Sequence, residues 1–454
     1  MGDHQAGGGQ RLTSPSADSI AAIATAPGAA GIGIVRLSGP AALTLQIPLV
    51  GRTLEPNRAR YLPVLDEAGE PLDQAVVLFF AAPHSYTGED VLELQGHGGP
   101  VVMQLLLDRV LALGARMARP GEFTERAFIN NKLDLAQAEA VSDLINASTE
   151  RAARAASRSL EGAFSQRVQS LLSELTALRV FVEGAIDFPT DEIDFLGEAA
   201  LGEKVARLVS LLDELLRGAR HGAALRNGLT LAIVGPPNAG KSSLLNALSG
   251  RDSAIVTEIP GTTRDVLREQ IQLDGVPLHL VDTAGLRESE DRVELEGMRR
   301  AVQAVESADH VLVMVDDADS DSRRPKLPPA APAQTVLYNK IDRSGANPGK
   351  GAEGLYISLR TGAGLDDLRA HLRSLAGASS EQEGQFSARG RHLRALETVR
   401  DHLAQAQALV QDDPQPELLA EELRLAQQAL ADITGEFVPD DLLGEIFSSF
   451  CIGK

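Results

Sequence analysis

The first third of the chain mixes short apolar runs with glycine and proline. Between residues 20 and 130, four segments have the length and β-branched content of strands, namely SIAAIAT, GIGIVRLSG, AVVLFF and DVLELQGHGG. The segment GPVVMQLLLDRVLALGA has apolar positions at helical spacing and is expected to end at Gly114. This mixture predicts an α+β domain, to which we assign residues 1–130.

From Leu133 to about Gly222 the apolar positions follow the period of an α-helix. The segments LDLAQAEAVSDLINASTERAARAASRSL and LGEKVARLVSLLDELLRGAR predict long amphipathic helices, which the proline-containing DFPTDEIDF interrupts. The same periodicity resumes at about Gly390 and continues to the last residues. We therefore expect an all-α domain in two parts, residues 131–221 and 379–454.

Between these two parts, apolar strands alternate with helical segments. The strands are LTLAIV, PLHLVD, HVLVMVD, QTVLYNK and GLYIS, and the polar stretch AGASSEQEGQ follows as a linker. This rhythm predicts an α/β domain with a mostly parallel sheet, over residues 222–378. Because the ends of a domain often lie close together, such a domain can be inserted into a discontinuous helical domain.

The inserted domain contains a pattern that binds phosphate. Gly235, Gly240, Lys241 and Ser242 form G-x-x-x-x-G-K-S between a predicted strand and a predicted helix. Lys241 would neutralise the β- and γ-phosphates, backbone N–H groups would cradle them, and the Ser242 hydroxyl would ligate Mg²⁺. A chance glycine-rich turn is the alternative, and the motifs that follow argue against it.

Three later stretches favour GTP as the nucleotide. Asp282 opens Asp-Thr-Ala-Gly after a strand and could hold Mg²⁺ through water, while the N–H of Gly285 could contact the γ-phosphate. The carboxylate of Asp342, in Asn-Lys-Ile-Asp, can accept two hydrogen bonds from guanine, and adenine lacks that donor pair. The segment Ser358-Leu359-Arg360 suits a backbone contact to guanine O6. In this order the motifs resemble those of translation-factor-type GTPases.

The expected switch segments depart from those of Ras. Thr263, in TEIPGTTRD, is expected to join Mg²⁺ when GTP is bound. Leu286 stands where Ras has a glutamine that orients water, and no arginine finger can be identified. A K⁺ ion held by the amide oxygen of Asn238 could replace that arginine. Alternatively Asn238 is only a turn residue, and the motif alone does not decide between these readings.

Composition and charge limit the classes of ligand and the cellular location that we expect. The net charge of −20 argues against broad, charge-driven binding of nucleic acid, although a local basic patch remains compatible with it. The sequence has no apolar run long enough for a membrane span, and its first residues do not resemble a targeting signal. A single cysteine excludes an internal disulfide and a cysteine metal cluster. We expect a cytoplasmic protein without membrane attachment.

That cysteine is Cys451, in the terminal FCIGK. It has the position of a prenylated cysteine, but Gly453 is not aliphatic and Lys454 is not an accepted final residue. The sequence leaves two readings, a small buried core residue and an active-site thiol.

Segments across nearly the whole chain resemble one family. They are GPPNAGKSSLLNAL, PGTTRDV, DTAGLRE, TGEDVLELQGHGG, RPGEFTERAF, NNKLDLAQAEAV, AIDFPTDEIDF, EELRLAQQAL, ITGEF and IFSSFCIGK. They resemble the MnmE (TrmE) family of tRNA-modifying GTPases. The flanking segments, above all the CIGK terminus, distinguish this family from ribosome-assembly GTPases with similar nucleotide-binding motifs.

The resemblance implies a folate-binding N-terminal domain, a discontinuous helical domain and an inserted G domain. It implies a homodimer formed through the N-terminal domains, and G domains that dimerise when GTP and K⁺ are bound. It further implies an FAD-dependent partner, MnmG, which carries the FAD. Together the two would install an aminomethyl or carboxymethylaminomethyl group at C5 of a wobble uridine, with a reduced folate (5-formyl- or methylene-tetrahydrofolate) as ligand and carbon source.

The resemblance also implies a set of site residues. The K⁺ ligands would be Asn238, Thr257, Ile259 and Thr262, and the Mg²⁺ ligands Ser242 and Thr263. The catalytic residues would be Glu294 (with Glu296 as the alternative), Lys241 and Cys451, and the folate ligands Arg36, Glu93, Lys132 and Lys454. By charge, Glu93 would suit the pterin edge, and Arg36 or Lys132 the glutamate tail. The residues expected to line the GTP site are Asn238, Ala239, Gly240, Lys241, Ser242, Ser243, Thr257, Glu258, Ile259, Pro260, Gly261, Thr262, Thr263, Asp282, Thr283, Ala284, Gly285, Asn339, Lys340, Asp342, Ser358, Leu359 and Arg360.

Some signals and rival functions remain open. His97 is interpreted as a structural turn residue, since no second ligand stands at metal spacing. Arginines at 151, 154 and 158, and at 389, 391 and 394, could meet tRNA phosphate, although solvated helix faces are the commoner explanation. The rival functions are a ribosome-assembly switch and a scaffold with a decayed G domain. Binding of reduced folate would exclude the first, and the intact Lys241, Ser242 and Asp342 argue against the second.

Overall fold

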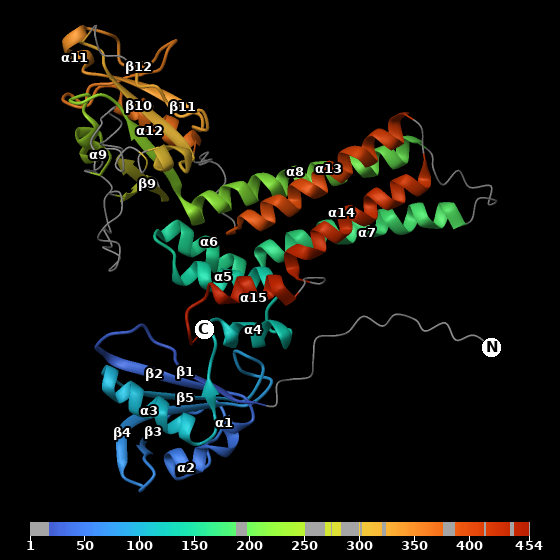
Figure 1. Ribbon diagram of the computed structural model, residues 1–454. Helices are drawn as coiled ribbons and strands as arrows, with labels where there is room; N and C mark the ends of the chain where they lie inside the picture. The colour runs from blue at the N-terminus through green and yellow to red at the C-terminus, as the bar shows by residue number, and fades with distance from the viewer. Residues whose placement is uncertain are drawn as a thin grey trace. The chain divides into compact units, whose positions relative to one another are not determined.

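Two units make up the chain in the computed structural model (Figure 1), and each is described by itself. The structure describes residues 18–187, 198–249, 268–273, 275–282, 299, 302–319, 324–375, 386–412, 415–435 and 440–453. Unit 1 joins the residues up to Ser142 with those from Ala431 onward, and unit 2 comprises Asp143–Leu430.

Within its described residues, unit 1 is built on a six-stranded sheet with the order β3–β4–β5–β2–β1–β6. The strands are β1 (Ile20–Ile23), β2 (Ala30–Ser38), β3 (Arg60–Leu65), β4 (Pro71–Phe80), β5 (Val91–Gly98) and β6 (Arg116–Met117). Adjacent strands are antiparallel except for the parallel pair β1 and β6. The helices of this region are α1 (Ala41–Thr44), α2 (Gln46–Val50) and α3 (Pro100–Ala112). The predicted α+β domain is confirmed.

The core of this sheet depends on a close approach between β2 and α3. Val35 and Leu37 on β2 and Leu94 on β5 are buried in one cluster with Met103 of α3. A Cβ atom at Gly33 would lie 2.3 Å from the sulfur of Met103. Glycine at this position therefore lets the helix pack directly on the strand.

The residues from Asp440 onward contribute to a second apolar cluster of unit 1. Helix α15 (Asp440–Ser448) packs near α4 (Glu122–Ile129). Phe447 lies between Phe128, at a ring-centroid distance of 6.4 Å, and Phe450, at 5.6 Å. Leu135 at the start of α5 (Leu135–Ile145) joins the same cluster. Residues far apart in sequence thus share one apolar core.

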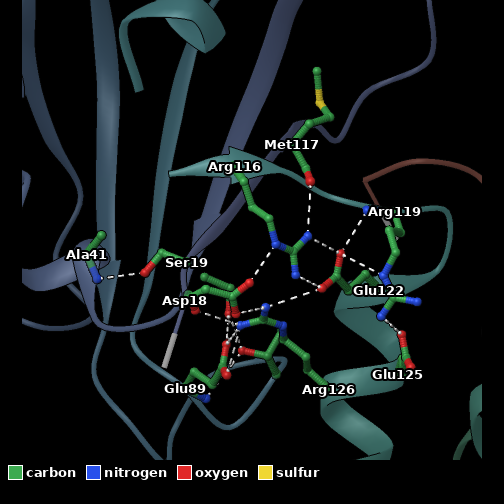
Figure 2. A network of polar contacts seen from close by, with 12 residues as sticks. Asp18, Ser19, Ala41, Glu89, Arg116, Met117, Arg119, Glu122, Glu125 and Arg126 are labelled. Carbon is green, nitrogen blue, oxygen red and sulfur yellow. Dashed lines mark hydrogen bonds and ion pairs between the residues drawn. The ribbon is translucent and has the colours of Figure 1, made fainter. Parts of the chain in front are cut away.

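A network of ion pairs fastens α4 to the sheet (Figure 2). The guanidinium of Arg126, 6% exposed, contacts Asp18 Oδ1 at 2.9 Å, Glu89 Oε2 at 3.1 Å and Glu122 Oε1 at 3.3 Å. Arg116 Nη1 donates to the other oxygen of Glu122 at 2.9 Å. Burial acts to raise the pKa of Glu122, but the hydrogen bonds from Arg116 and from a backbone N–H lower it below its usual range. The buried carboxylate of Glu122 therefore stays ionised and paired.

Unit 2 begins with helices on both sides of the insertion. They are α6 (Glu150–Leu160), α7 (Ala163–Asp187) and α8 (Glu198–Asn227), followed after the insertion by α13 (Gly390–Asp412) and α14 (Pro416–Thr434). Helices α8 and α13 lie side by side (Figure 1) although the whole inserted domain separates them in sequence. The predicted discontinuous helical domain is confirmed. Helix α8 continues to Asn227, beyond the boundary that we placed at 222.

The sequence predicted one long helix through LDLAQAEAVSDLINASTERAARAASRSL, and this prediction is wrong. Instead, α5 ends at Ile145 and α6 begins at Glu150. Thr149 has extended backbone angles, and its hydroxyl accepts a hydrogen bond from the N–H of Ala152. Threonine in this position caps a helix N-terminus, so the chain starts a new helix rather than continuing the old one.

A buried carboxylate marks the point where the inserted domain leaves and rejoins the helices. Asp143, at the end of α5, is 4% exposed and accepts from Arg226 Nε and from Arg389 Nη2, both at 2.7 Å. The hydroxyl of Ser387 donates to its other oxygen at 3.3 Å. Arg226 precedes the inserted domain and Arg389 follows it. Arg389 therefore has a structural role, which argues against the tRNA contact considered for it.

The inserted domain has a sheet with the order β12–β13–β11–β10–β7–β9–β8 in the part that the structure describes. Its elements are β7 (Leu229–Val234), α9 (Lys241–Ser249), β8 (Arg268–Leu273), β9 (Val276–Asp282), β10 (His310–Asp316), β11 (Gln334–Asn339), α11 (Ile341–Ser344), β12 (Gly349–Lys350), β13 (Leu355–Tyr356) and α12 (Leu365–Leu375). The strands pair in parallel except at the two edges. Both faces are covered, because Ile233 belongs to one core cluster and its neighbour Val234 to another. The predicted α/β domain is confirmed.

None of the helices in the described residues combines the length and the apolar character needed to cross a lipid bilayer.

The ion network of α4 predicts a specific loss of stability. Changing Arg126→Ala removes the buried cation that three carboxylates share; Asp18 and Glu122 keep Arg116, so the free energy of unfolding should fall by about 3 kcal/mol, the lower end for breaking a buried pair. Thermal and urea denaturation would measure this. The control is Arg119→Ala, whose side chain is 64% exposed and whose loss should cost less than about 1 kcal/mol. Similar losses for the two variants would contradict the assigned role of Arg126.

Candidate functional site

The predicted phosphate-binding loop runs from β7 to α9. Asn238 and Gly240 have left-handed backbone angles, with φ values of +62° and +105°, and α9 begins at Lys241. The ammonium of Lys241 donates to the carbonyls of Gly235 at 2.9 Å and Pro236 at 3.2 Å. Lys241 is thus folded over the loop, where it can exchange carbonyl partners for phosphate oxygens.

Asn339 ties this loop to the region predicted to bind the base. It is 3% exposed; its Nδ2 donates to the carbonyl of Ala239 at 2.8 Å, and its Oδ1 accepts from the N–H of Leu359 at 3.2 Å. A Cβ atom at Gly240 would lie 2.5 Å from that Nδ2. One buried amide therefore connects three segments that the sequence assigned separately.

Asp342 lies at the same edge of the sheet. The buried hydroxyl of Ser358 donates to its Oδ1 at 2.6 Å, and Arg360 Nη2 contacts its Oδ2 at 2.7 Å. The hydrogen bond from Ser358 lowers the pKa of Asp342, and the Arg360 guanidinium adds to this effect. The carboxylate is therefore ionised at neutral pH, and each oxygen keeps a lone pair for a further donor. These contacts join Asp342, Ser358 and Arg360 in one cluster.

The sequence analysis missed Asp316, the last residue of β10. Its Oδ2 accepts from the ammonium of Lys340 at 2.6 Å. Burial acts to raise the pKa of Asp316, but hydrogen bonds from Lys340 and a backbone N–H lower it. Asp316 stands opposite Asn339 in the parallel pairing of β10 and β11. An acid ending an apolar strand at the same sheet edge is the signal that could have identified it.

The predicted switch residues lie mostly outside the described residues. Asp282 ends β9, and only its place in the strand is described. Ser242 and Ser243 are exposed at the start of α9. The residues outside the described part are Thr257, Glu258, Ile259, Pro260, Gly261, Thr262, Thr263, Thr283, Ala284, Gly285, Leu286, Glu294, Glu296 and Lys454. Their roles stay predictions.

Asn238 is exposed on the phosphate-binding loop. Its left-handed backbone conformation is one that asparagine tolerates better than most residues. This geometry agrees with the turn-residue reading, and an exposed amide oxygen also agrees with the K⁺ reading. Both interpretations of Asn238 therefore stay open.

In unit 1, the structure brings two predicted folate residues together. Arg36 on β2 stands opposite Glu93 on β5, and its Nε and Nη2 both lie 2.9 Å from Glu93 Oε1. The guanidinium of Arg36 also lies 5.6 Å from the ring centre of Tyr86 and 5.8 Å from that of Phe123. The two aromatic residues were not predicted. The pair is about one-fifth exposed or less, at 19% and 12%.

Lys132 follows α4 and contacts the loop between β4 and β5 that carries Tyr86. Its ammonium donates to the carbonyl of Pro83 at 3.1 Å, and its side chain contacts the position where Gly88 lacks a Cβ. The hydroxyl of Tyr86 shares a hydrogen bond of 2.8 Å with Thr124 on α4. Lys132 has a neutral partner here, whereas Arg36 is already paired with a carboxylate.

The terminal residues pack beside α4 and β1. The N–H of Gly121 donates to the carbonyl of Cys451, and a Cβ atom at Gly453 would lie 2.4 Å from the carbonyl oxygen of Ile23. Ile23 is one residue from Ala22, the partner of Arg36 in the β1–β2 register. Cys451 itself is exposed, so the reading of it as a buried core residue is wrong. The apolar anchor of the tail is Phe450, which is 6% exposed.

The weaker signals have structural explanations. His97 lies within β5, one residue before its end, so the reading of it as a turn residue is wrong. Its Nδ1 lies 2.7 Å from Asp73 Oδ1. Arg154 pairs with Glu150 on its own helix. Within the described residues there is no group of three or more histidine, cysteine or acidic side chains that could hold a metal ion.

Comparisons with known proteins cover nearly all of the chain. The family model for the MnmE helical domain matches residues 135–451, and the model for the N-terminus of the GTP-binding protein TrmE matches residues 19–132. A protein of Proteus mirabilis (strain HI4320) named tRNA modification GTPase MnmE is 53% identical over 453 residues, 97% of this chain and 100% of that one. A protein of Yersinia pseudotuberculosis serotype IB (strain PB1/+) with the same name is 54% identical over 451 residues, 96% and 99% of the two chains.

Among solved structures, Aquifex aeolicus Era bound to GDP·AlF4⁻ is 27% identical over 38% of this chain and 66% of that chain, with a TM-score of 0.26. That score is too low to support a structural argument. The full-length relatives and the two family models, one of which spans more than half of the residues, identify the family. The chain belongs to the MnmE family of tRNA modification GTPases.

Proposed function

We propose that this chain binds and hydrolyses GTP in its inserted domain, and that it uses the reaction in tRNA modification, as the names of its relatives state for them. The observation that carries the proposal is the edge of the sheet where Asn339, Asp342 and Ser358 meet the phosphate-binding loop. An ionised carboxylate beside a loop that can receive phosphates is the arrangement that a guanine nucleotide requires.

The residues present fit the nucleotide and its metal. Lys241 would transfer its donors from the two loop carbonyls to the β- and γ-phosphates, while the backbone N–H groups at the start of α9 face the same oxygens. The exposed hydroxyl of Ser242 would ligate Mg²⁺ together with Thr263. Glu294 remains the proposed residue for orienting water.

Potassium activation is a further part of the proposal. Asn238, with Thr257, Ile259 and Thr262, would hold K⁺ where other GTPases use an arginine finger. This part depends on the family resemblance and on the exposed position of the Asn238 amide.

A reduced folate, either 5-formyl- or methylene-tetrahydrofolate, is the proposed ligand of unit 1. Glu93 Oε1 accepts a hydrogen bond from Arg36 Nε and lies 2.9 Å from its Nη2, while Oε2 accepts one from Gln95 and keeps a lone pair for a pterin N–H. Tyr86 and Phe123 offer aromatic faces beside the pair. Lys132, whose partner within the described residues is a carbonyl rather than a carboxylate, suits the glutamate tail better than Arg36 does. Lys454 remains a proposed ligand.

The proposed partners follow the same family. They are a second copy of the chain, the FAD-dependent MnmG and tRNA. The carbon chemistry at C5 of the wobble uridine would belong to the folate and to the flavin of MnmG, and GTP hydrolysis would drive a conformational change. The cytoplasmic location expected from the sequence stays a prediction.

Potassium should accelerate GTP hydrolysis. We expect phosphate release at least about tenfold faster in KCl than in NaCl, because the cation replaces an arginine finger whose effect is about 10³- to 10⁵-fold. Asn238→Gly keeps the left-handed backbone but lacks the amide oxygen, so it should lose the difference. Asn238→Asp, which keeps an oxygen, is the matched control. Equal rates in the two salts at matched ionic strength would refute K⁺ activation.

Asp342→Asn should change the choice of base. An amide at this position cannot accept from both N1–H and N2–H₂ of guanine, but it can donate to the second carbonyl of xanthine. Because hydrogen bonds to a charged group contribute about 1.5–3 kcal/mol, preference should shift from GTP toward XTP by about 10- to 100-fold. Competition binding of the two nucleotides measures this. An unchanged preference for GTP would disprove the assignment of the base site.

Cys451→Ser should separate the two activities. Because Cys451 is exposed and lies in unit 1, GTP hydrolysis should be unchanged, while tRNA modification should fail if the thiol is needed. The measurement is nucleoside mass spectrometry of tRNA from cells that lack this protein and carry the wild-type or the variant chain. Full modification by the variant would give Cys451 no chemical role. Normal wobble uridines in the cells without any copy would overturn the proposed function.

A further inference from the structure

The hairpin formed by β8 and β9 contacts the helices of unit 2 at its turn. The two strands pair continuously from Arg268 opposite Val281 to Leu273 opposite Val276. Gly275, in the turn, has a φ of +85°. This turn lies against the start of α6 and the end of α8, and nothing in the proposed function uses that contact.

One hydroxyl serves both partners of this contact. Thr149 Oγ1 donates to the carbonyl of Gly275 at 2.8 Å and accepts from the N–H of Ala152 at 3.1 Å. Thr149 is 7% exposed, so both hydrogen bonds are shielded from water. The group that caps α6 is therefore the same group that holds the hairpin, and a shift of the hairpin acts directly on the first turn of the helix.

Further contacts hold the hairpin against α6 and α8, and we call this contact region the junction. Val276 of β9 is buried with Ala155 of α6 and Leu225 of α8. His279 of β9 lies 3.0 Å from the carbonyl of Asn227 through its Nε2. The hairpin is thus held to two helices by apolar packing and by hydrogen bonds at separate points.

The hairpin also connects the two segments assigned to the γ-phosphate. β8 begins at Arg268, five residues after Thr263, and β9 ends at Asp282, the first residue of Asp-Thr-Ala-Gly. Because its strands are paired along their whole length, the hairpin moves as one piece, and a change at either end displaces its turn.

We propose that Thr149 is a positioning residue that couples the nucleotide state of the inserted domain to α6 through the β8–β9 hairpin. The coupling rests on the proposed binding of GTP. In this proposal, the first turn of α6 is the part of the helical domain that responds to the nucleotide. The hydrogen bond from Thr149 to Gly275 transmits the displacement of the hairpin to that turn.

Hydrogen–deuterium exchange of the full chain tests this coupling. Exchange of residues 146–160 is compared with GDP and with the non-hydrolysable GTP analogue GMPPNP, and the loop at residues 235–245 reports nucleotide binding. The wild type should show a difference between the two nucleotides in α6. Thr149→Ser keeps both hydrogen bonds and should retain that difference.

The decisive variant is Thr149→Asp. Aspartate caps a helix as well as serine does but has no proton to donate to Gly275, so the nucleotide-dependent difference in α6 should fall about fivefold, the factor expected for one hydrogen bond of ordinary strength. Val276→Ala loosens the junction from the hairpin side without altering the cap, and should also reduce the difference. If the Thr149→Asp variant does not fold, Val276→Ala is used in its place.

The outcomes are distinguishable. An undiminished difference in the folded Thr149→Asp variant, or in Val276→Ala if that variant alone folds, overturns the coupling. The coupling is also overturned if the wild-type loop is protected by GMPPNP while α6 shows no difference. Absence of protection at residues 235–245 would instead overturn the proposed binding of GTP, and the coupling would fall with it.

Discussion

The architecture of unit 2 depends on the buried carboxylate of Asp143. A charge taken out of water destabilises the fold unless it is paired and hydrogen-bonded. Here two guanidinium groups and one hydroxyl satisfy it, and they come from residues on opposite sides of the inserted domain. The carboxylate is therefore paired only when Arg226, which precedes the inserted domain, and Arg389, which follows it, both lie beside Asp143. The requirement for paired charge fixes where the insertion begins and ends.

Unit 1 also has a buried charge that must be paired, and here the charge is positive. Arg126 is the buried cation, and carboxylates from three segments gather around it. Nearby, Arg36 is balanced by Glu93 across two strands. Both cations lie on elements that frame the proposed folate site, so the residues that stabilise this domain also shape the surface where a charged ligand would bind.

Local patterns were sufficient for much of this picture, because strands, helices and the phosphate-binding loop follow from residues close together in sequence. The break before α6 was missed, since a single capping threonine outweighed a continuous apolar period. The pairing of Lys340 with Asp316, and of Arg36 with Glu93, depends on strand register, which the sequence does not display. The exposure of Cys451 was also beyond prediction, because it depends on how the neighbouring Phe450 is anchored.

The position of the last aromatic residues has a consequence for biosynthesis. Phe447 and Phe450 belong to the apolar cluster that covers α4 and α5, yet a ribosome adds them only after the whole of unit 2. At about 5–20 residues per second, the roughly 300 residues between the end of α5 and Phe447 take about 15–60 seconds to synthesise, and α4 and α5 lack their apolar cover for that time. A message cut short, or a ribosome that stalls, therefore yields a product with an open apolar surface, which chaperones and proteases can distinguish from the finished protein.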